Sequence, residues 1–334
     1  MPAVRTPRTA AVDERRFHDW LSGTLPAGRR GLLPLGDDAA ALRVPPGKVA
    51  VLSVDALVEG THFLRGAPPR AIGAAAAGVS LSDLAAKGAA PAALLLAVIV
   101  PPGTPQSWLE SVSRGAEAMG ERFGMPLVGG DTKPGPVRTV VSSVLGWGSV
   151  RSLAPRTGAR PGDVVATTGT VGRGGAAAAR LGRRTAPGPR ALAAMLEVEP
   201  RVREGSALVR WAHAMLDTSD GIAEAARLLA RASGVRVEVD EGALPLAPAL
   251  RRRPLSRSVR RARAFYGGDY ELLVALPAAA LRPASDAVRR SGGRLTAIGR
   301  VSRGEGAWLR YAGRVEPMPA AGWRPFARRP RPPP

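Results

Sequence analysis

The chain contains no cysteine and only three histidines (His18, His62 and His213) among its 334 residues. The absence of thiols excludes disulfides, thiolate zinc sites, iron–sulfur clusters and cysteine nucleophiles. Three scattered histidines argue against a metal site built from several imidazoles. Aromatic residues make up 4% of the chain, so we expect a core of Ala, Val and Leu. Any catalytic chemistry is therefore expected to rest mainly on oxygen donors.

Lysine is also scarce, although the chain is strongly basic. Of the 48 basic residues, three are Lys and 45 are Arg; against 27 acidic residues they give a net charge of +21. Such a charge is typical of proteins that bind nucleic acid or another polyanion. However, Arg is abundant here together with Ala, Gly and Pro, whose codons are GC-rich, and no aromatic residues are interleaved to stack on bases. Polyanion or nucleic-acid binding is therefore an alternative of a different class, and not the main expectation.

Long apolar runs are absent. The longest, at 92–100, has nine residues and stops at Pro101-Pro102, which predicts a strand and not a membrane span. Residues 1–11 lack the apolar stretch of a secretory signal. These features favour a soluble, cytoplasmic protein that does not act at a membrane.

The length predicts two domains, at about 150 residues for each. Residues 1–12 and the Pro/Arg tail at 328–334 have no apolar period and are expected to be disordered. The stretch 149–162, rich in Arg, Gly and Pro, predicts a boundary between an N-terminal domain (13–150) and a C-terminal domain (151–327).

Strand-like and helix-like patterns alternate in both halves, which predicts two α/β (α+β) domains. Strands are predicted at 49–54, 92–100, 126–128, 137–146, 163–168, 235–239, 270–276 and 295–301. Helices are predicted at 69–87, 108–123, 174–181, 202–215, 222–232 and 278–290. The arginine-rich stretch 251–263 is predicted to be an exposed loop or basic face.

Aspartate is the residue type whose placement is most informative. Of 13 aspartates, seven lie in short motifs flanked by Gly or Ser, namely Asp37, Asp38, Asp55, Asp83, Asp131, Asp217 and Asp220. Taken singly, Asp37-Asp38 is typical of a turn and Asp220 of a helix N-cap. Asp83 could form an exposed ion pair with Lys87, worth about 0.3–0.5 kcal/mol. Taken together, the motifs indicate a shared acidic site.

An acidic site without His or Cys partners is typical of Mg²⁺, which prefers oxygen ligands and is usually held by carboxylates together with substrate phosphates. Carboxylates gathered in one place repel one another unless cations neutralise them. These properties favour phosphoryl transfer, in which positioning and charge neutralisation supply most of the catalysis. The sequence has neither a P-loop nor the H-R-D and D-F-G motifs of protein kinases. The Gly-rich turn 168–175 either receives an anion at a helix N-terminus or is a tight connection.

Seven motifs occur in a fixed order, at 36–40, 53–63, 81–89, 129–132, 156–163, 217–221 and 267–272. Together they resemble the thiamine-monophosphate kinases, a family related to aminoimidazole ribonucleotide synthetase. The resemblance covers the chain from about residue 35 to residue 326. It implies a two-domain fold like that of the synthetase, a homodimer formed through the β-sheet of the N-terminal domain, and ATP bound near that interface.

The activity that this resemblance implies is ATP-dependent phosphorylation of thiamine monophosphate to thiamine diphosphate. The γ-phosphoryl group of ATP would pass directly to the substrate phosphate with the help of several Mg²⁺ ions. An ATP-dependent enzyme of the same superfamily that acts on another substrate is the alternative.

The resemblance also implies roles for individual residues. Metal ligands are implied at Asp38, Ser53, Val54, Asp55, Asp83, Asp131, Asp217 and Asp220. Val54, where the family usually has Thr, would act through its backbone carbonyl. ATP contacts are implied at Gly130, Asp131, Arg156 and Ser219, and substrate contacts at His62, Asp269 and Trp323. No general base is implied, because the attacking phosphate oxygen is already anionic.

One motif departs from the family pattern. Gly267-Gly268-Asp269-Tyr270 is one acid shorter than the family's Gly-Gly-acid-Asp-Tyr-Glu-Leu. Because glycine permits backbone angles closed to other residues, we expect the turn to carry Asp269 into the site. There its carboxylate would face the positive thiazolium of the substrate.

Overall fold

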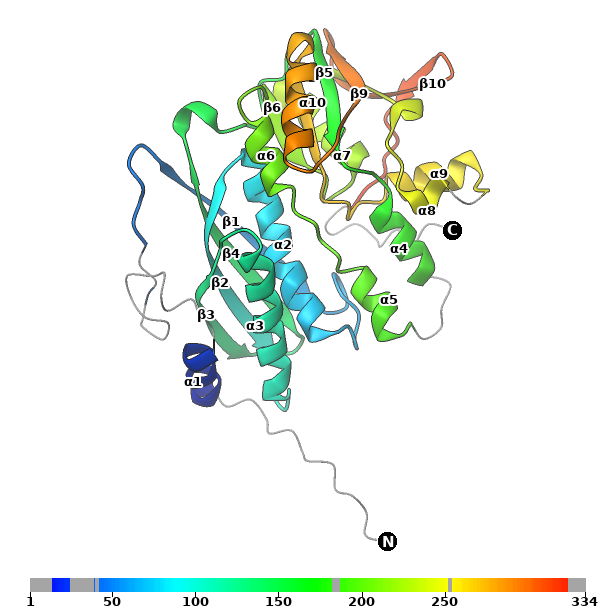
Figure 1. Cartoon of the computed structure of the whole chain (residues 1–334). Coiled ribbons are helices and arrows are strands. Elements are labelled where there is room, and N and C mark those ends of the chain that lie inside the picture. The colour runs from blue at the N-terminus through cyan, green and yellow to red at the C-terminus, as the bar shows by residue number, and fades with distance from the viewer. Residues whose placement is uncertain (1–13, 25–38, 40–41, 182–186, 252–253, 324–334) are drawn as a thin grey trace.

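Two β-sheets organise the chain (Figure 1). The computed structural model describes residues 14–24, 39, 42–181, 187–251 and 254–323. Within them, a four-stranded sheet has the order β1-β4-β2-β3, with β1 Val49–Val58, β2 Ala90–Val100, β3 Leu127–Pro134 and β4 Thr139–Gly148. A seven-stranded sheet has the order β11-β10-β7-β9-β5-β8-β6, with β5 Asp163–Thr168, β6 Ala214–Asp217, β7 Arg236–Asp240, β8 Leu272–Pro277, β9 Leu295–Ser302, β10 Gly306–Tyr311 and β11 Arg314–Pro317.

The helices lie between these strands in the chain. They are α1 Glu14–Thr24, α2 Pro69–Lys87, α3 Gln106–Glu121, α4 Arg173–Leu181, α5 Pro189–Ala194, α6 Val202–Leu208, α7 Ile222–Ser233, α8 Pro248–Arg251, α9 Arg257–Ala264 and α10 Leu281–Arg290. Short 3-10 turns occur at Val150–Ser152, Glu241–Ala243 and Ala278–Ala280. The predicted α/β class with two domains is confirmed.

Helix α2 has the bounds that the sequence predicts. Pro69 occupies its first turn, and Gly88 ends it in the left-handed conformation, with φ of 67°. The helix packs on one face of the four-stranded sheet beside α3 (Figure 1). Glycine makes this close approach possible, because a Cβ atom at Gly73 would lie 1.8 Å from the carbonyl oxygen of Val112 on α3.

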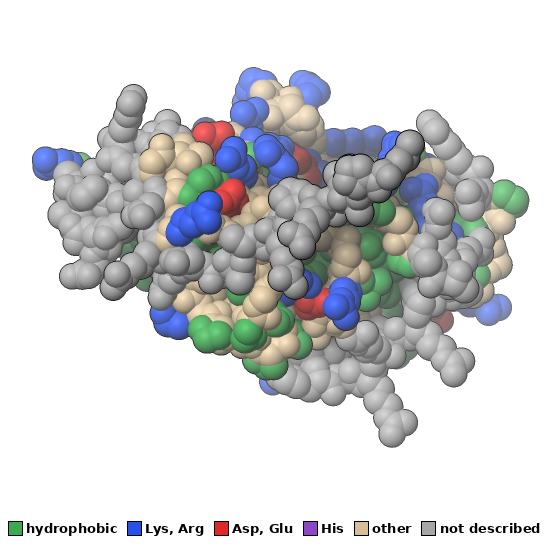
Figure 2. Space-filling view, turned by 90° about the horizontal axis from the view of Figure 1, so that it is seen from below, with side chains coloured by type: hydrophobic (Ala, Val, Ile, Leu, Met, Phe, Trp, Pro, Cys, Tyr) green, Lys and Arg blue, Asp and Glu red, His purple; other side chains and the backbone are tan. Residues whose placement is uncertain are grey.

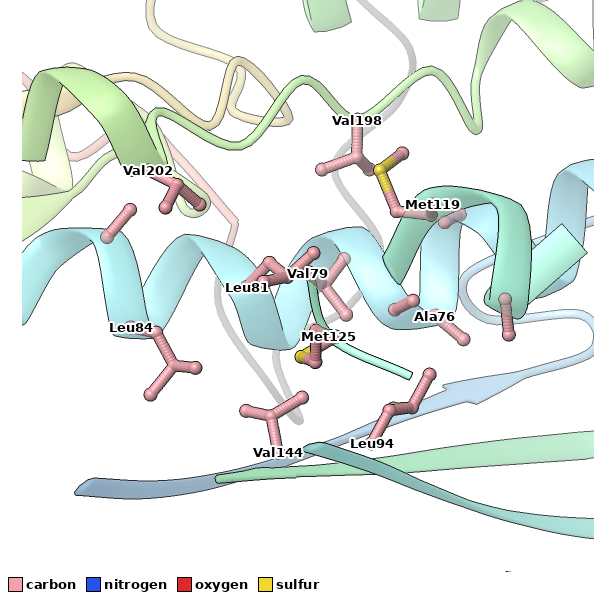
Figure 3. Packing of buried hydrophobic residues seen from close by; sticks show 14 of the residues in the cluster. Ala76, Val79, Leu81, Leu84, Leu94, Met119, Met125, Val144, Val198 and Val202 are labelled. Atoms are coloured by element: carbon pink, nitrogen blue, oxygen red, sulfur yellow. The ribbon is translucent and has the colours of Figure 1, made fainter. Parts of the chain in front are cut away.

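Both halves of the chain bury α2. Of its 19 residues, 13 are buried. Val79 and Leu84 share one hydrophobic cluster with Val198 and Val202, which follow more than a hundred residues later (Figure 3). Helix α6 approaches α2 so closely that a Cβ atom at Gly205 would lie 2.0 Å from the carbonyl oxygen of Ala85. Helix α2 is therefore held between the two halves of the chain.

Two predicted elements differ from the structure. The predicted helix at 202–215 is instead α6 followed by strand β6, which pairs antiparallel with β8. Ala, Met and Leu favour helix locally, but burial of Met215 and Leu216 inside the sheet prevails. Part of the predicted loop at 251–263 forms α9, which buries Arg263 and Ala264, while Arg257 is exposed.

Many arginines are paired with acids. Arg257 and Arg261 bind Glu241 at 2.8 and 2.6 Å, and Arg236 and Arg300 approach Glu238 at 3.5 and 3.2 Å. In Figure 2 the basic side chains on one face lie in separate groups, several of them beside acids. Within the described residues, no helix has the combination of length and apolarity needed to cross a membrane.

Candidate active site

A cavity of about 420 Å³ lies where the two halves of the chain meet. Its walls come from the end of β1, helix α2, the segment 195–198, the turn between β6 and α7, the turn 266–270 and Trp323. Seven of the residues that the sequence singles out line it: Asp55, His62, Asp83, Asp217, Ser219, Asp220 and Trp323. Residues separated by up to 268 positions are thus brought together.

Three of these aspartates act on one another electrostatically. Burial raises the pKa of Asp55 to about 7, and the carboxylates of Asp83 and Asp217 add to this effect. Burial and Asp83 likewise raise the pKa of Asp217 to about 6. Burial and Glu224 raise the pKa of Asp220. Since each shift reflects the cost of a carboxylate charge, the cavity favours a bound cation.

Serine hydroxyls fix the direction of the carboxylates. Ser82, the neighbour of Asp83 on α2, donates to Asp217 Oδ2 at 2.8 Å, and Ser219 donates to Asp217 Oδ1 at 3.0 Å. Ser53 on β1 donates a short hydrogen bond to Asp83. Ser53 therefore supports a site acid even though it does not itself line the cavity.

Lys87 forms no ion pair with this cluster, although its charge acts on Asp217 and Asp83 from a distance. Its ammonium group donates to the carbonyl oxygens of Ala154 and Met215, at 3.2 and 3.1 Å, so the alternative of an exposed Asp83–Lys87 ion pair is wrong. Within the described residues, Asp55, Asp83 and Asp217 form no ion pair with a basic side chain.

The donor set fits Mg²⁺ that is bound together with a ligand. No three His, Asp or Glu side chains in the described ranges converge closely enough to enclose an ion alone. Mg²⁺ usually takes one or two carboxylates and completes its octahedron with waters and phosphate oxygens. Aspartates spread over several walls of a cavity suit that arrangement, because phosphates between them complete the coordination.

Other predicted ligands lie elsewhere. Asp131 is on β3, at the opposite edge of the sheet from Asp55 on β1, which is about 14 Å away across three strand spacings. Its carboxylate accepts from Lys133 at 2.7 Å and is outside the cavity. Gly130 packs against Leu96, where a Cβ atom would lie 2.0 Å from the carbonyl oxygen. The structure does not place Asp131 and Asp55 on the same ion within one chain.

The remaining predicted residues are placed as follows. The Val54 side chain is 63% exposed on the outer face of the sheet, so only its backbone is available to a ligand. Arg156 is exposed, yet it lies near enough to Asp220 to lower the pKa of that carboxyl. Asp38 lies outside the described residues.

Aromatic rings form another part of the cavity. The rings of His62 and Trp323 have centroids 6.0 Å apart and are inclined by 47°. Nδ1 of His62 accepts from the backbone N–H of Val58 at 3.1 Å, so the proton of the neutral imidazole is on Nε2. Burial lowers the pKa of His62, which favours this neutral form. The backbone N–H of Trp323 donates to the carbonyl oxygen of Asp220 at 3.0 Å, which ties the ring to the acidic wall.

Asp269 does not enter the cavity, and our expectation for its orientation is corrected. Its side chain is buried, and its carboxylate oxygens accept from the backbone N–H groups of Gly172 and Gly174 at 2.7 and 3.0 Å. Burial raises the pKa of Asp269 to about 6. The carboxylate of Asp269 therefore occupies the backbone N–H groups at the start of α4, where a ligand anion could otherwise bind. Of the two interpretations of the turn 168–175, the structure supports the tight connection.

Some cavity residues were missed by sequence reasoning. Tyr266 and Tyr270 flank the Gly267-Gly268 turn, and Met195, Leu196 and Val198 form an apolar wall. Tyr270 belongs to the recognised motif at 267–272 and Tyr266 directly precedes it, which was a usable signal. No local sequence signal marked the apolar wall, because the position of its residues depends on packing against α2.

Comparisons with known proteins agree with this geometry. Residues 36–150 match the model of the AIR synthase related protein N-terminal domain, and residues 160–311 match that of the C-terminal domain. The chain is similar to a thiamine-monophosphate kinase from Synechococcus elongatus, with 37% identity over 272 residues that cover 75% of this chain and 82% of that protein.

Solved structures give the same result. A thiamine-monophosphate kinase from Stenotrophomonas maltophilia K279a superposes with a TM-score of 0.76 at 33% identity, covering 84% of this chain and 91% of the other. AaThiL complexed with AMPPCP and TMP superposes with a TM-score of 0.73 at 29% identity, covering 87% and 91%.

Proposed function

The chain belongs to the thiamine-monophosphate kinase family of AIR synthase related proteins, and on that basis we propose that it phosphorylates thiamine monophosphate with ATP. The observation that carries the proposal is the convergence of Asp55, Asp83, Asp217 and Asp220 on one cavity that also holds an aromatic pair. The acids, through the cations that they bind, suit the phosphate end of the substrate, and the aromatic rings suit its cationic heterocycle. Use of ATP also suits the expected cytoplasmic location.

Mg²⁺ would be held by Asp55, Asp83 and Asp217, with Asp220 beside them. When bound, it neutralises phosphate charge and lets two anionic groups approach each other. The protein's own part is to hold the carboxylates in place through Ser53, Ser82 and Ser219. Gly130, Asp131 and Arg156 are proposed to contact ATP.

His62 and Trp323 would hold the heterocycle of the substrate. The Nε2–H of His62 is a hydrogen-bond donor, and the Trp323 indole offers a π face that attracts a cation. Because the attacking substrate phosphate oxygen is anionic at neutral pH, the chain needs no general base. This accounts for a site rich in aspartate and poor in histidine.

We also propose a homodimer formed through the outer face of the four-stranded sheet. Leu52 is 75% exposed and Val54 63%, and with Leu95 they border an apolar groove of about 400 Å³. Exposed apolar surface of this kind marks an association site. A second copy of the chain is the occupant that the family resemblance implies.

The test is an assay of the purified chain with ATP, Mg²⁺ and thiamine monophosphate, in which thiamine diphosphate is measured by chromatography. We expect product and ADP in equal amounts, and none without Mg²⁺. Unphosphorylated thiamine is the matched control and should give no product, because it lacks the phosphate acceptor. ATP consumption with another phosphorylated acceptor but not with thiamine monophosphate would favour the alternative enzyme of the superfamily.

A further inference from the structure

Tyr270 has an unusual backbone conformation at the edge of the cavity. Its φ is +54°, in the left-handed region that residues other than glycine rarely occupy. Among the described non-glycine residues, Ala312 alone shares a positive φ with it. Strained backbone of this kind persists only where the surrounding structure holds it, and it is concentrated at functional sites.

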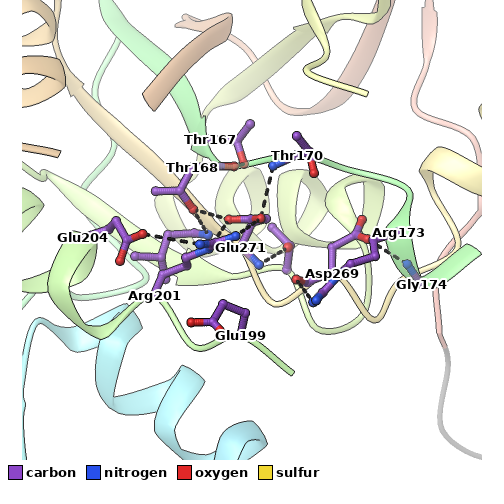
Figure 4. Close-up of polar contacts among 12 residues, drawn as sticks. Thr167, Thr168, Thr170, Arg173, Gly174, Glu199, Arg201, Glu204, Asp269 and Glu271 are labelled. Carbon is purple, nitrogen blue, oxygen red and sulfur yellow. Dashed lines mark hydrogen bonds and ion pairs between the residues drawn. The ribbon is translucent and has the colours of Figure 1, made fainter. Parts of the chain in front are cut away.

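The residue before Tyr270 is held firmly. Both carboxylate oxygens of Asp269 accept hydrogen bonds from backbone N–H groups at the start of α4, those of Gly172 and Gly174 (Figure 4). In addition, the guanidinium of Arg173 donates to the carbonyl oxygen of Asp269 at 3.1 Å. The backbone on the N-terminal side of Tyr270 is therefore anchored to the seven-stranded domain.

The residue after Tyr270 is held as firmly, by a different set of bonds. Glu271 is buried and accepts two hydrogen bonds from the guanidinium of Arg201, at 2.7 and 2.6 Å (Figure 4). Thr168 Oγ1 donates to the same carboxylate at 2.8 Å. The backbone N–H of Glu271 donates to Thr218 Oγ1 at 3.0 Å, and its carbonyl oxygen accepts from the N–H of Thr218 at 2.8 Å. Hydrogen bonds to six other residues thus hold the two neighbours of one strained residue.

The side chain of Tyr270 faces the acidic part of the cavity. It lines the cavity, and the carboxylates of Asp217, Asp55 and Asp220 act on it electrostatically. Within the described part of the chain, its hydroxyl has no hydrogen-bond partner. A neutral O–H among carboxylates is a donor suited to an anionic oxygen that cations bring into the cavity.

We propose that the Tyr270 hydroxyl donates a hydrogen bond to a phosphate oxygen of a ligand in the cavity, and that Asp269 and Glu271 are positioning residues that hold Tyr270 for this contact. The proposal rests on the proposed function, which supplies two phosphate-bearing ligands, the nucleotide and thiamine monophosphate. A hydrogen bond to the phosphate of either ligand has the same chemistry, so kinetic measurements must show which of the two ligands accepts it.

The first experiment is Tyr270→Phe, which keeps the ring and removes the hydroxyl. A lost hydrogen bond to a charged group predicts a fall in kcat/KM of about 10- to 100-fold at unchanged melting temperature. A change confined to thiamine monophosphate assigns the contact to that phosphate, and a change confined to ATP assigns it to the nucleotide. The matched control is Tyr311→Phe, on β10 and outside the cavity, which should be silent. Wild-type kcat and KM values for both ligands in Tyr270→Phe would overturn the contact.

The second experiment tests positioning with a double-mutant cycle. Glu271→Gln should lower kcat/KM in the wild-type chain but cause little further loss in Tyr270→Phe, because it acts through the missing hydroxyl. A purely structural Glu271 would lower the melting temperature and cause the same fold-loss in both backgrounds, which would overturn its positioning role.

Calorimetry separates this proposal from the proposed function. If wild-type protein binds Mg²⁺-ATP or thiamine monophosphate without turnover, the proposed function fails, yet Tyr270→Phe should still weaken binding by the same factor. Equal binding by the wild-type chain and Tyr270→Phe, or binding of neither ligand by the wild-type chain, would overturn the tyrosine contact.

Discussion

The hydroxyl of Ser82 donates a 2.8 Å hydrogen bond to the carboxylate of Asp217, and this single bond joins the central helix of the N-terminal half to a strand of the C-terminal half. Ser82 is fully buried on α2, and Asp217 ends β6. The bond holds Asp217 next to α2, and it therefore fixes the separation between Asp217 and Asp83, the residue that follows Ser82.

Ser82→Ala should weaken both stability and activity. The bond lowers the pKa of Asp217, and its loss leaves a buried carboxylate with one partner fewer, which costs about 1.5–3 kcal/mol. We expect a lower melting temperature and a higher Mg²⁺ concentration at half-maximal rate. Ser107→Ala, at an exposed position on α3, is the matched control. An unchanged Mg²⁺ requirement would show that the bond does not position Asp217.

Asp83→Asn should nearly abolish turnover while the chain stays folded. Removing one carboxylate from a metal–phosphate clamp costs a few kcal/mol of transition-state stabilisation, which is about a hundredfold or more in kcat. Asp286→Asn, an acid outside the cavity that pairs with Arg289, should retain full activity. Rates within a few-fold of wild type for Asp83→Asn would assign this residue to structure alone. Asp37→Asn should lower kcat less than Asp83→Asn does, because the implied metal ligand of the pair is Asp38. Equal losses of kcat for Asp37→Asn and Asp83→Asn would refute the assignment of Asp38 as the ligand.

Stability should depend on pH in opposite ways with and without Mg²⁺. The folded-state pKa values of about 7 for Asp55 and about 6 for Asp217 exceed the value of about 3.9 in an unfolded chain. The folded chain therefore holds more protons between pH 4 and 7, and without divalent cation its free energy of unfolding falls as the pH rises through that window. Mg²⁺ binds the ionised acids and should restore stability above pH 7.

Melting curves between pH 5 and pH 8, with EDTA or with excess Mg²⁺, check this expectation. Asp55→Asn should flatten the profile recorded in EDTA, because it removes one of the titrating groups. Parallel profiles in EDTA and in Mg²⁺ would contradict a cation site at these acids.

Leu52→Asp should convert the proposed dimer to monomers. A charge placed on the outer face of β1 would be desolvated on association, which the apolar groove cannot compensate. Sedimentation velocity measures the mass directly. Leu64→Asp places the same charge at an exposed apolar residue outside the groove and should leave the mass unchanged. A Leu52→Asp chain that sediments like the wild type would remove this face as the interface.

How far the sequence predicted the structure depended on the range of the interactions involved. Helix α2 was predicted to the residue, because Pro69 and Gly88 act within one turn of its ends. Motifs of a known family placed Asp55, Asp83 and Asp217 in one site, and the structure brings them together. Local patterns could not show that β6 is a strand, since its pairing partner β8 is more than 50 residues away.

Asp269 illustrates the same limit within the site. Its turn suggested a flexible acid, whereas its direction is decided by two N–H groups almost a hundred residues earlier in the chain. Asp269 and Glu271 are acids of the recognised motif, yet the carboxylate of Asp269 binds backbone N–H groups and that of Glu271 binds Arg201 and Thr168. The residue between them, Tyr270, lines the cavity.

The burial of α2 by both halves of the chain has a consequence for biosynthesis. The helix leaves the ribosome about 120 residues before α6 and β6, and at 5–20 residues per second it waits roughly 6–24 s for the segments that cover it. During this interval its alanine-rich surface faces water or a chaperone. Until then the part of α2 that packs against Val198 and Val202 stays uncovered, so we expect the nascent N-terminal half to be prone to aggregation.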